Sequence, residues 1–147
     1  MVTIRNLLQD DLILEEMTAT DKAGVIREFA SLLAARGRVI NEDELVRALS
    51  DRELRGSTGI GGGVAIPHGR LKSITDMIVA FGRSHDGVDF QALDGKPVYL
   101  FFLLLTPLDM PGEHLKILAR ISRILKNQVL RDNLRHASLR APQGAVI

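Results

Sequence analysis

Apolar side chains recur at helical spacing in two segments near the start of the chain. The first predicts a helix from about residue 21 to Arg36, with Thr20 as its cap and Gly37 ending it in the left-handed conformation. The second predicts a helix that Asn41 caps and that ends near Leu54, with three acidic residues in its first turn. The apolar positions are Val25, Ile26, Phe29, Leu32 and Leu33 in the first helix, and Leu45, Val46 and Leu49 in the second.

Three short apolar runs have the length and composition of buried strands. They span Leu12 to Leu14, Ile74 to Phe81 and Val98 to Leu105. The second and third runs are separated by a turn-rich stretch that includes His85-Asp86-Gly87, and the third is followed by a predicted loop from Thr106 to Gly112 with two prolines.

A third helix is predicted to begin at Glu113 and to end near Lys126 or Asn127. Its expected apolar side consists of Leu115, Leu118, Ile121, Ser122 and Leu125. Helices and strands alternate along the chain, and no linker or internal repeat divides it. We therefore predict an α/β fold, a single-domain layered fold with a central mixed β-sheet flanked by helices, over residues 1–140. Residues 141–147 are expected to form a C-terminal tail.

Composition narrows the possible functions. The chain has 147 residues, 46% of them hydrophobic, which is enough for one buried core. It contains no cysteine, so disulfides, thiolate metal sites and cysteine nucleophiles are excluded. The net charge of +1 gives no reason to expect nucleic acid or a membrane as partner. The start does not resemble a secretory signal, and the longest apolar run is too short to span a membrane, so we expect a cytoplasmic protein without direct membrane insertion.

The segment from Gly56 to Gly69 has an unusual composition, with six glycines and a Pro-His pair around the short apolar stretch Val64 to Ile66. Glycine clusters often bind phosphate, but this one lacks the Gly-Lys-Ser/Thr end of a P-loop. The third glycine of a dinucleotide-binding motif would fall on an apolar residue. We therefore expect no nucleotide cofactor.

His68 lies just after this apolar stretch, between Pro67 and Gly69. A neutral imidazole can attack a phosphoryl group if donors and a cation stabilise the transition state, and Arg52, Ser57 and Thr58 could supply them. Judged by spacing alone, a hydrogen-bonded structural histidine is the more common case.

The chain contains three further histidines. His114, at the start of the third predicted helix, suits a second phosphate ligand, because the helix dipole favours an anion there; an exposed histidine without a partner is the alternative. His85 and His136 have no companion at metal-ligand spacing, so no metal is predicted.

The run from Arg52 to Gly69 resembles the active-site signature of the fructose/mannitol-type enzyme IIA domains of the phosphoenolpyruvate-dependent sugar phosphotransferase system, which include a nitrogen-regulatory branch. The similarity continues through Gly87 to Phe90, Leu93 to Val98 and Glu113 to Leu115, and covers about residues 7–134. This resemblance implies a phosphotransferase component that carries phosphohistidine, with no cofactor and no metal.

The resemblance also implies roles for individual residues. His68 would accept a phosphoryl group from phospho-HPr or its nitrogen-branch counterpart, and pass it to a cysteine of a IIB domain or use it as a regulatory switch. Arg52 would stabilise the charge and His114 would be the second active-site histidine, while Ser57 and Thr58 are weaker candidates for phosphoryl binding.

The chain departs from the family pattern at two places. Gly62 stands where many relatives carry a polar or acidic residue, so acceptor preference is expected to differ. The sequence from Ala141 to Gly144 replaces the further helix that relatives add after the segment matching Arg131 to His136. The Gly-Ser-Thr-Gly-Ile-Gly stretch from Gly56 to Gly61 and the absence of fused IIB, IIC or HPr modules slightly favour the nitrogen branch.

A function of another class stays open. The chain could be a non-catalytic binding module that controls a kinase or transporter by direct contact. The basic stripe from Lys116 to Arg140 lacks interleaved aromatic residues, so it is read as a solvated helix face or a docking face for an acidic protein.

Overall fold

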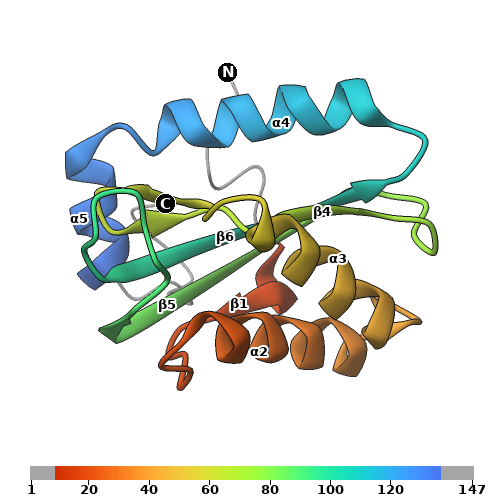
Figure 1. Ribbon diagram of the computed structural model, residues 1–147, viewed down its shortest axis with the longest axis horizontal. Helices are drawn as coiled ribbons and strands as arrows, with labels where there is room; N and C mark the ends of the chain where they lie inside the picture. The colour runs from red at the N-terminus through yellow and green to blue at the C-terminus, as the bar shows by residue number, and fades with distance from the viewer. Residues whose placement is uncertain (1–8, 137–147) are drawn as a thin grey trace.

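A computed structural model of the protein describes residues 9–136, so the predicted tail at 141–147 lies outside the described residues. The described chain is a three-layer α/β structure, as predicted (Figure 1). Its helices are η1 (Asp10–Leu12), α2 (Lys22–Ala35), α3 (Glu42–Leu54), α4 (Pro111–Ile124) and α5 (Gln128–His136). Its strands are β1 (Ile13–Leu14), β2 (Gly59–Gly61), β3 (Val64–Ala65), β4 (His68–Leu71), β5 (Ile78–Val88) and β6 (Val98–Pro107).

The strands form one mixed sheet in the order β1-β5-β6-β3-β2. β4 lies on the same side of β6 as β3 and pairs with the later residues of β6, Leu104 to Pro107. β6 is the central strand, because it pairs antiparallel with β5 and parallel with both β3 and β4. Helices α2 and α3 cover one face of the sheet, and α4 and α5 cover the other (Figure 1). The predicted mixed sheet between helical layers is therefore confirmed.

Each face of the sheet has its own hydrophobic core. Successive side chains of a strand point to opposite faces, so Phe101 of β6 packs toward α2 and α3 while Phe102 packs toward α4 and α5. Phe101 meets Phe90 edge to face at 5.3 Å, and Phe102 meets Phe81 in the same way at 4.8 Å. Because the central strand is buried on both sides, its sequence is a continuous apolar run without alternation.

The starts of α2 and α3 were predicted to within one residue. Asn41 caps α3 as expected, with its side chain accepting from the Glu44 amide at 3.0 Å. Thr20 was wrong as the cap of α2, since Asp21 accepts from the Gly24 amide at 2.8 Å instead. Gly37 has the left-handed φ of 69° that its position predicted.

Several other element bounds differ from the prediction. The strand expected at Ile74 to Phe81 begins at Ile78 and continues to Val88, through the predicted turn at His85. A register shift between Arg83 and Val88 accommodates these residues as an irregularity of the strand, with Gly87 at φ 88°.

The predicted loop after β6 is shorter than expected. β6 extends to Pro107 and α4 begins at Pro111, two residues before the predicted start. Helix α5, which the sequence reading treated as part of a basic face, was missed as an element. Within residues 9–136, no helix has the length and apolar composition that crossing a membrane would require.

Candidate active site

His68 is the first residue of β4, directly beside the central strand. Its Cα is paired in register with Leu104 of β6, and the carbonyl of Pro67 accepts from the Leu104 amide at 2.9 Å. The strand thus fixes the backbone on which the imidazole is mounted. The side chain is only partly exposed and lines a cavity together with residues of α3 and α4.

Both ring nitrogens of His68 have a partner, and the partners define the tautomer. The Nδ1 atom lies 2.7 Å from the carbonyl oxygen of Ile66, which can only accept, so Nδ1 carries the proton. The Nε2 atom accepts from Arg52 Nε at 3.1 Å, so it holds a lone pair. His68 is therefore a neutral imidazole whose nucleophilic nitrogen is Nε2.

The surroundings favour this neutral form. Burial lowers the pKa of His68 below its ordinary value, and the charge of Arg52 lowers it further. The hydrogen bond to Ile66 and the charge of Glu53 act in the opposite direction without reversing the shift. The imidazole thus keeps its lone pair at neutral pH.

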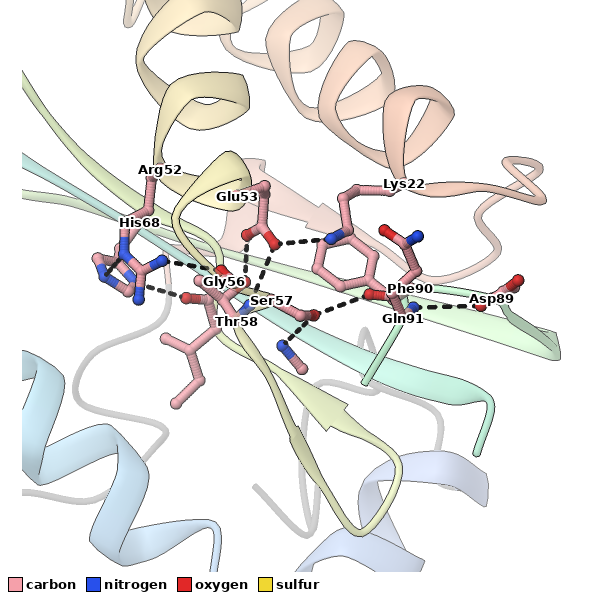
Figure 2. A network of polar contacts seen from close by, with 12 residues as sticks. Lys22, Arg52, Glu53, Gly56, Ser57, Thr58, His68, Asp89, Phe90 and Gln91 are labelled. Carbon is pink, nitrogen blue, oxygen red and sulfur yellow. Dashed lines mark hydrogen bonds and ion pairs between the residues drawn. The ribbon is translucent and has the colours of Figure 1, made fainter. Parts of the chain in front are cut away.

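Arg52 lies in the last turn of α3, with its guanidinium directed at His68. In addition to the bond to His68, its Nη1 donates to the Gly56 carbonyl at 2.9 Å (Figure 2). Two ends of the guanidinium are therefore fixed by one backbone and one side-chain acceptor. The arginine predicted to balance phosphoryl charge is in contact with the predicted acceptor.

His114 comes from α4, and the structure brings it next to His68. The two ring centroids are 5.4 Å apart, with planes inclined by 55°. Burial, followed by the charges of His68 and Arg70, lowers the pKa of His114 to about 4. Its Nδ1 lies 2.7 Å from the hydroxyl of Thr106, a buried residue at the end of β6. When that hydroxyl donates, the proton of His114 is on Nε2 and is free to be donated in turn.

His68 and His114 line a cavity of about 450 Å³ between α3, β4 and α4. Three arginines and one acidic residue contribute to its wall, so the cavity is suited to an anion. The lining residues are Ala48, Asp51, Arg52, Arg55, His68, Gly69, Arg70, Leu108, Pro111, His114 and Leu115.

Sequence reasoning missed part of this lining. Arg70 could have been found, because it lies two residues from His68 on the same strand and therefore on the same side. Leu115, predicted to belong to the core side of its helix, is 66% exposed and lies at the cavity instead. Leu108, at 51% exposed, adds a second apolar side chain at the rim.

Ser57 and Thr58 make their hydrogen bonds away from the cavity. The Ser57 hydroxyl donates to the Phe90 carbonyl at 2.8 Å and accepts from the Gly59 amide at 3.0 Å. The Thr58 hydroxyl, which is buried, donates to Glu53. Binding a phosphoryl group would require both hydroxyls to leave these partners, so their role as phosphoryl ligands stays a prediction.

Glu53, next to Arg52, is a buried acid that the sequence did not single out. It is 7% exposed and accepts from the Thr58 amide at 3.0 Å as well as from the Thr58 hydroxyl. Lys22, the first residue of α2, forms an ion pair with it at 3.2 Å (Figure 2). Charged residues are rarely buried unless they are paired. Glu53 is both buried and paired, so its burial has a structural explanation.

Gly62 lies in the turn between β2 and β3, and its amide donates to Asp94 at 3.1 Å. Its φ is 66°, and a Cβ built there would lie 3.3 Å from the guanidinium carbon of Arg131 on α5. The position at which the sequence departs from the family pattern is thus approached by an arginine. The expected effect on acceptor preference stays a prediction.

The arrangement can stabilise a phosphoryl group on an imidazole. It offers a neutral nucleophilic nitrogen, an arginine already in contact with that nitrogen, and a second neutral histidine nearby. Within the described part of the chain, no group of three or more histidine and acidic side chains is placed to hold a metal ion.

Comparisons with known proteins point to one family. The family model described as "Phosphoenolpyruvate-dependent sugar phosphotransferase system, EIIA 2" matches residues 6–141. The fructose-specific EIIA component of Haloferax volcanii is 40% identical over 84% of this chain and 80% of its own length. The nitrogen regulatory protein of Bradyrhizobium diazoefficiens is 39% identical over 90% of this chain and 86% of its own length. By contrast, the chain spans only 21% of the fructose-specific EIIABC component of Bacillus subtilis, which is 36% identical over 134 residues.

Solved structures give the same picture. The nitrogen regulatory protein IIA-Ntr of Neisseria meningitidis has a TM-score of 0.84 and 36% identity over 92% of each chain. A complex of enzyme IIAMTL with phosphorylated enzyme IIBMTL from Escherichia coli has a TM-score of 0.72 at 21% identity, covering 88% of this chain and 90% of the matched one. At that identity the likeness shows the fold alone.

Proposed function

Since the chain belongs to the EIIA 2 family of the phosphoenolpyruvate-dependent sugar phosphotransferase system, we propose that it is a phosphocarrier whose phosphoryl acceptor is Nε2 of His68. The observation that carries this assignment is the pair of hydrogen bonds to the His68 ring. The Nδ1 proton is donated to the backbone carbonyl of Ile66. The Nε2 lone pair accepts from Arg52, which lines the same cavity as His68. The proposed unit is one domain over residues 1–140, acting in the cytoplasm.

The reaction is a transfer of one phosphoryl group between nitrogens. The Nε2 lone pair forms a bond to phosphorus while the bond between phosphorus and the donor's histidine nitrogen breaks, and that electron pair returns to the donor. His68 neither gains nor loses a proton, because Nδ1 stays protonated and bonded to Ile66. In the second step a nucleophile of the acceptor attacks phosphorus, and the electron pair returns to Nε2.

Arg52 and His114 stabilise the charge that is being transferred. Arg52 Nε must leave the Nε2 lone pair when phosphorus arrives, and it then donates to a phosphoryl oxygen without moving far. His114 donates from Nε2 to another oxygen, provided that Thr106 keeps its Nδ1 occupied. Arg70, which lines the same cavity, adds positive charge.

The proposed donor is phospho-HPr or its nitrogen-branch counterpart, and the proposed acceptor is a IIB cysteine. Relatives named for fructose transport and for nitrogen regulation match the chain with nearly equal identity, so both branches stay in the proposal. The exposed apolar side chains of Leu108 and Leu115 at the cavity rim support docking of a protein partner over His68.

The test is phosphorylation in a reconstituted system. The protein is incubated with phosphoenolpyruvate, enzyme I and HPr, in the sugar version and separately in the nitrogen version, and its intact mass is measured. Wild type should gain one acid-labile phosphoryl group with at least one donor set, and His68→Ala should gain none. A wild type that stays unmodified with both sets contradicts the proposal, and the donor set that works identifies the branch.

A regulatory role by contact is the second candidate, supported by relatives named nitrogen regulatory protein. In this role phosphorylation of His68 would change the affinity for a kinase or transporter. A pull-down with wild type and His68→Ala, each with and without phosphorylation, tests it. If both proteins retain the same partner to the same extent under both conditions, phosphorylation does not control that partner.

A further inference from the structure

The buried ion pair between Lys22 and Glu53 is not used by the chemistry described so far. Glu53 does not line the cavity, and its carboxylate points away from His68 toward α2 and the glycine-rich segment (Figure 2). Resting on the proposed function, we infer that Glu53 is a positioning residue for phosphoryl transfer. It holds the backbone around Thr58, so that Arg52 stays directed at His68 Nε2.

Both carboxylate oxygens of Glu53 accept hydrogen bonds. One carboxylate oxygen accepts from the Thr58 amide and from Lys22 Nζ, and the other accepts from the Thr58 hydroxyl. The last turn of α3 is thereby joined to the third residue beyond the helix cap. Glu53 thus closes a short loop that begins at its own helix end.

The loop that Glu53 closes presents a backbone carbonyl to Arg52. Gly56 lies between the helix end and Thr58, has a φ of 140°, and its carbonyl accepts from Arg52 Nη1. The opposite side of the guanidinium, Nε, donates to His68 Nε2. Since a guanidinium is planar and rigid, fixing one nitrogen on Gly56 helps to aim another at His68. The chain of contacts therefore runs from Glu53 through the loop to the proposed nucleophile.

Lys22 anchors Glu53 from the side of α2. Lys22 lies at the start of α2, between Glu53 at 3.2 Å and the face of the Phe90 ring at 5.0 Å. The Phe90 carbonyl in turn accepts from the Ser57 hydroxyl. Phe90 belongs to the segment Gly87 to Phe90, a stretch of family resemblance that is distant in sequence from the active-site run. Its contacts with Ser57 and Lys22 therefore join this segment to the same loop.

Charge balance gives this pair a second property. A buried carboxylate so near the site would oppose a doubly charged phosphoryl group, whereas Lys22 compensates its charge. A buried ion pair contributes little net stability compared with apolar residues of similar size. Its presence beside an active site is therefore better explained by geometry than by stability.

The test separates positioning from folding with substitutions of graded severity. Thr58→Val removes only the hydroxyl contact, and Glu53→Ala removes the whole anchor. Thr18→Val and Glu16→Ala are matched controls, since both positions are exposed and lie outside the network. Each variant is assayed for the initial rate of phosphorylation over a range of phospho-HPr concentrations. Unfolding temperature is recorded in parallel, and the ¹⁵N shifts of Arg52 Nε and His68 Nε2 are measured without any donor.

We expect kcat to fall about tenfold in Thr58→Val and about a hundredfold in Glu53→Ala, with KM for the donor unchanged, because the docking face is intact. Both ¹⁵N shifts should move toward those of groups without a mutual hydrogen bond, while the controls match wild type. If Glu53→Ala does not fold, Glu53→Gln replaces it. The ¹⁵N shifts of Arg52 Nε and His68 Nε2 in that variant then decide whether Glu53 positions Arg52. Folded variants with wild-type kcat and wild-type shifts overturn the inference. If wild type itself accepts no phosphoryl group, the proposed function fails, and the shifts alone still decide the positioning role.

Discussion

Acidification should destabilise the folded protein through His114, by an amount that follows from its burial. Its pKa of about 4 lies well below the ordinary 6.5 that it regains on unfolding. Between these values the unfolded chain binds the proton and the folded chain does not. The stability contributed by the neutral ring is therefore complete above pH 6.5 and is lost as the pH falls toward 4.

The size of the effect can be worked out at pH 4.5. There the unfolded histidine is almost fully protonated and the folded one mostly neutral, which favours unfolding by roughly 2 kcal/mol relative to pH 7. For a domain of this size that corresponds to a decrease in Tm of about 4–8 °C. Acid has other effects on the stability of a folded protein, so the contribution of His114 is isolated by comparing variants.

The comparison uses His114→Asn, which keeps a polar side chain beside Thr106 but does not titrate. Thermal unfolding is followed by circular dichroism at pH 7 and pH 4.5 for wild type, for this variant and for His136→Asn, which removes an exposed histidine at the end of α5. The decrease in Tm should be about 4–8 °C smaller in His114→Asn than in the other two proteins. Equal decreases in all three would refute the account of His114 burial.

Three further predictions concern the site and the two cores. Arg52→Lys should lower the rate of His68 phosphorylation about a hundredfold in the reconstituted assay, because the ammonium of lysine lacks the planar, rigid set of donors that binds His68 and Gly56; an unchanged rate would remove Arg52 from the mechanism. Phe102→Ala should lower the free energy of unfolding in urea by about 3–5 kcal/mol, since the ring is fully buried, and a loss below about 1 kcal/mol would contradict the packing. Gly82→Ala should also unfold at a lower urea concentration than wild type, because the added Cβ would lie 2.5 Å from Met17 Sδ. A variant as stable as wild type would show that Met17 moves aside without cost.

Local signals in the sequence predicted those parts of the fold that depend on neighbouring residues. The Asn41 cap and the left-handed Gly37 were both recognised, because the conformation they adopt is a property of one residue and the turn beside it. Thr20 and Asp21 are both good caps, and their order could not be decided locally. Asp21 also forms an isolated bridge with Asp89, a contact between distant segments.

Several features that the sequence did not predict depend on long-range pairing. The continuation of β5 past His85 is set by its pairing with β6, which a pattern of turn residues does not reveal. For the same reason Thr106 was read as part of a loop, although it ends the central strand and contacts His114. Buried charges are equally hard to foresee, because Glu53 resembles any exposed acid of an amphipathic helix until its partner from α2 is known.

The candidate site itself was largely predictable. His68, Arg52 and His114 were identified from the motif, and the structure brings all three together. The direction of Ser57 and Thr58 could not be predicted, because their partners, the Phe90 carbonyl and Glu53, are set by packing between segments.

The most direct test of the account is to locate the phosphoryl group on the phosphorylated protein. A long-range ¹H–¹⁵N spectrum of histidine-labelled protein, recorded before and after incubation with the active donor set, reports which ring nitrogen is substituted. We predict that Nε2 of His68 acquires the phosphoryl group while Nδ1 keeps its proton, as the bonds to Arg52 and Ile66 require. Substitution at Nδ1, or on any other histidine, would contradict the account.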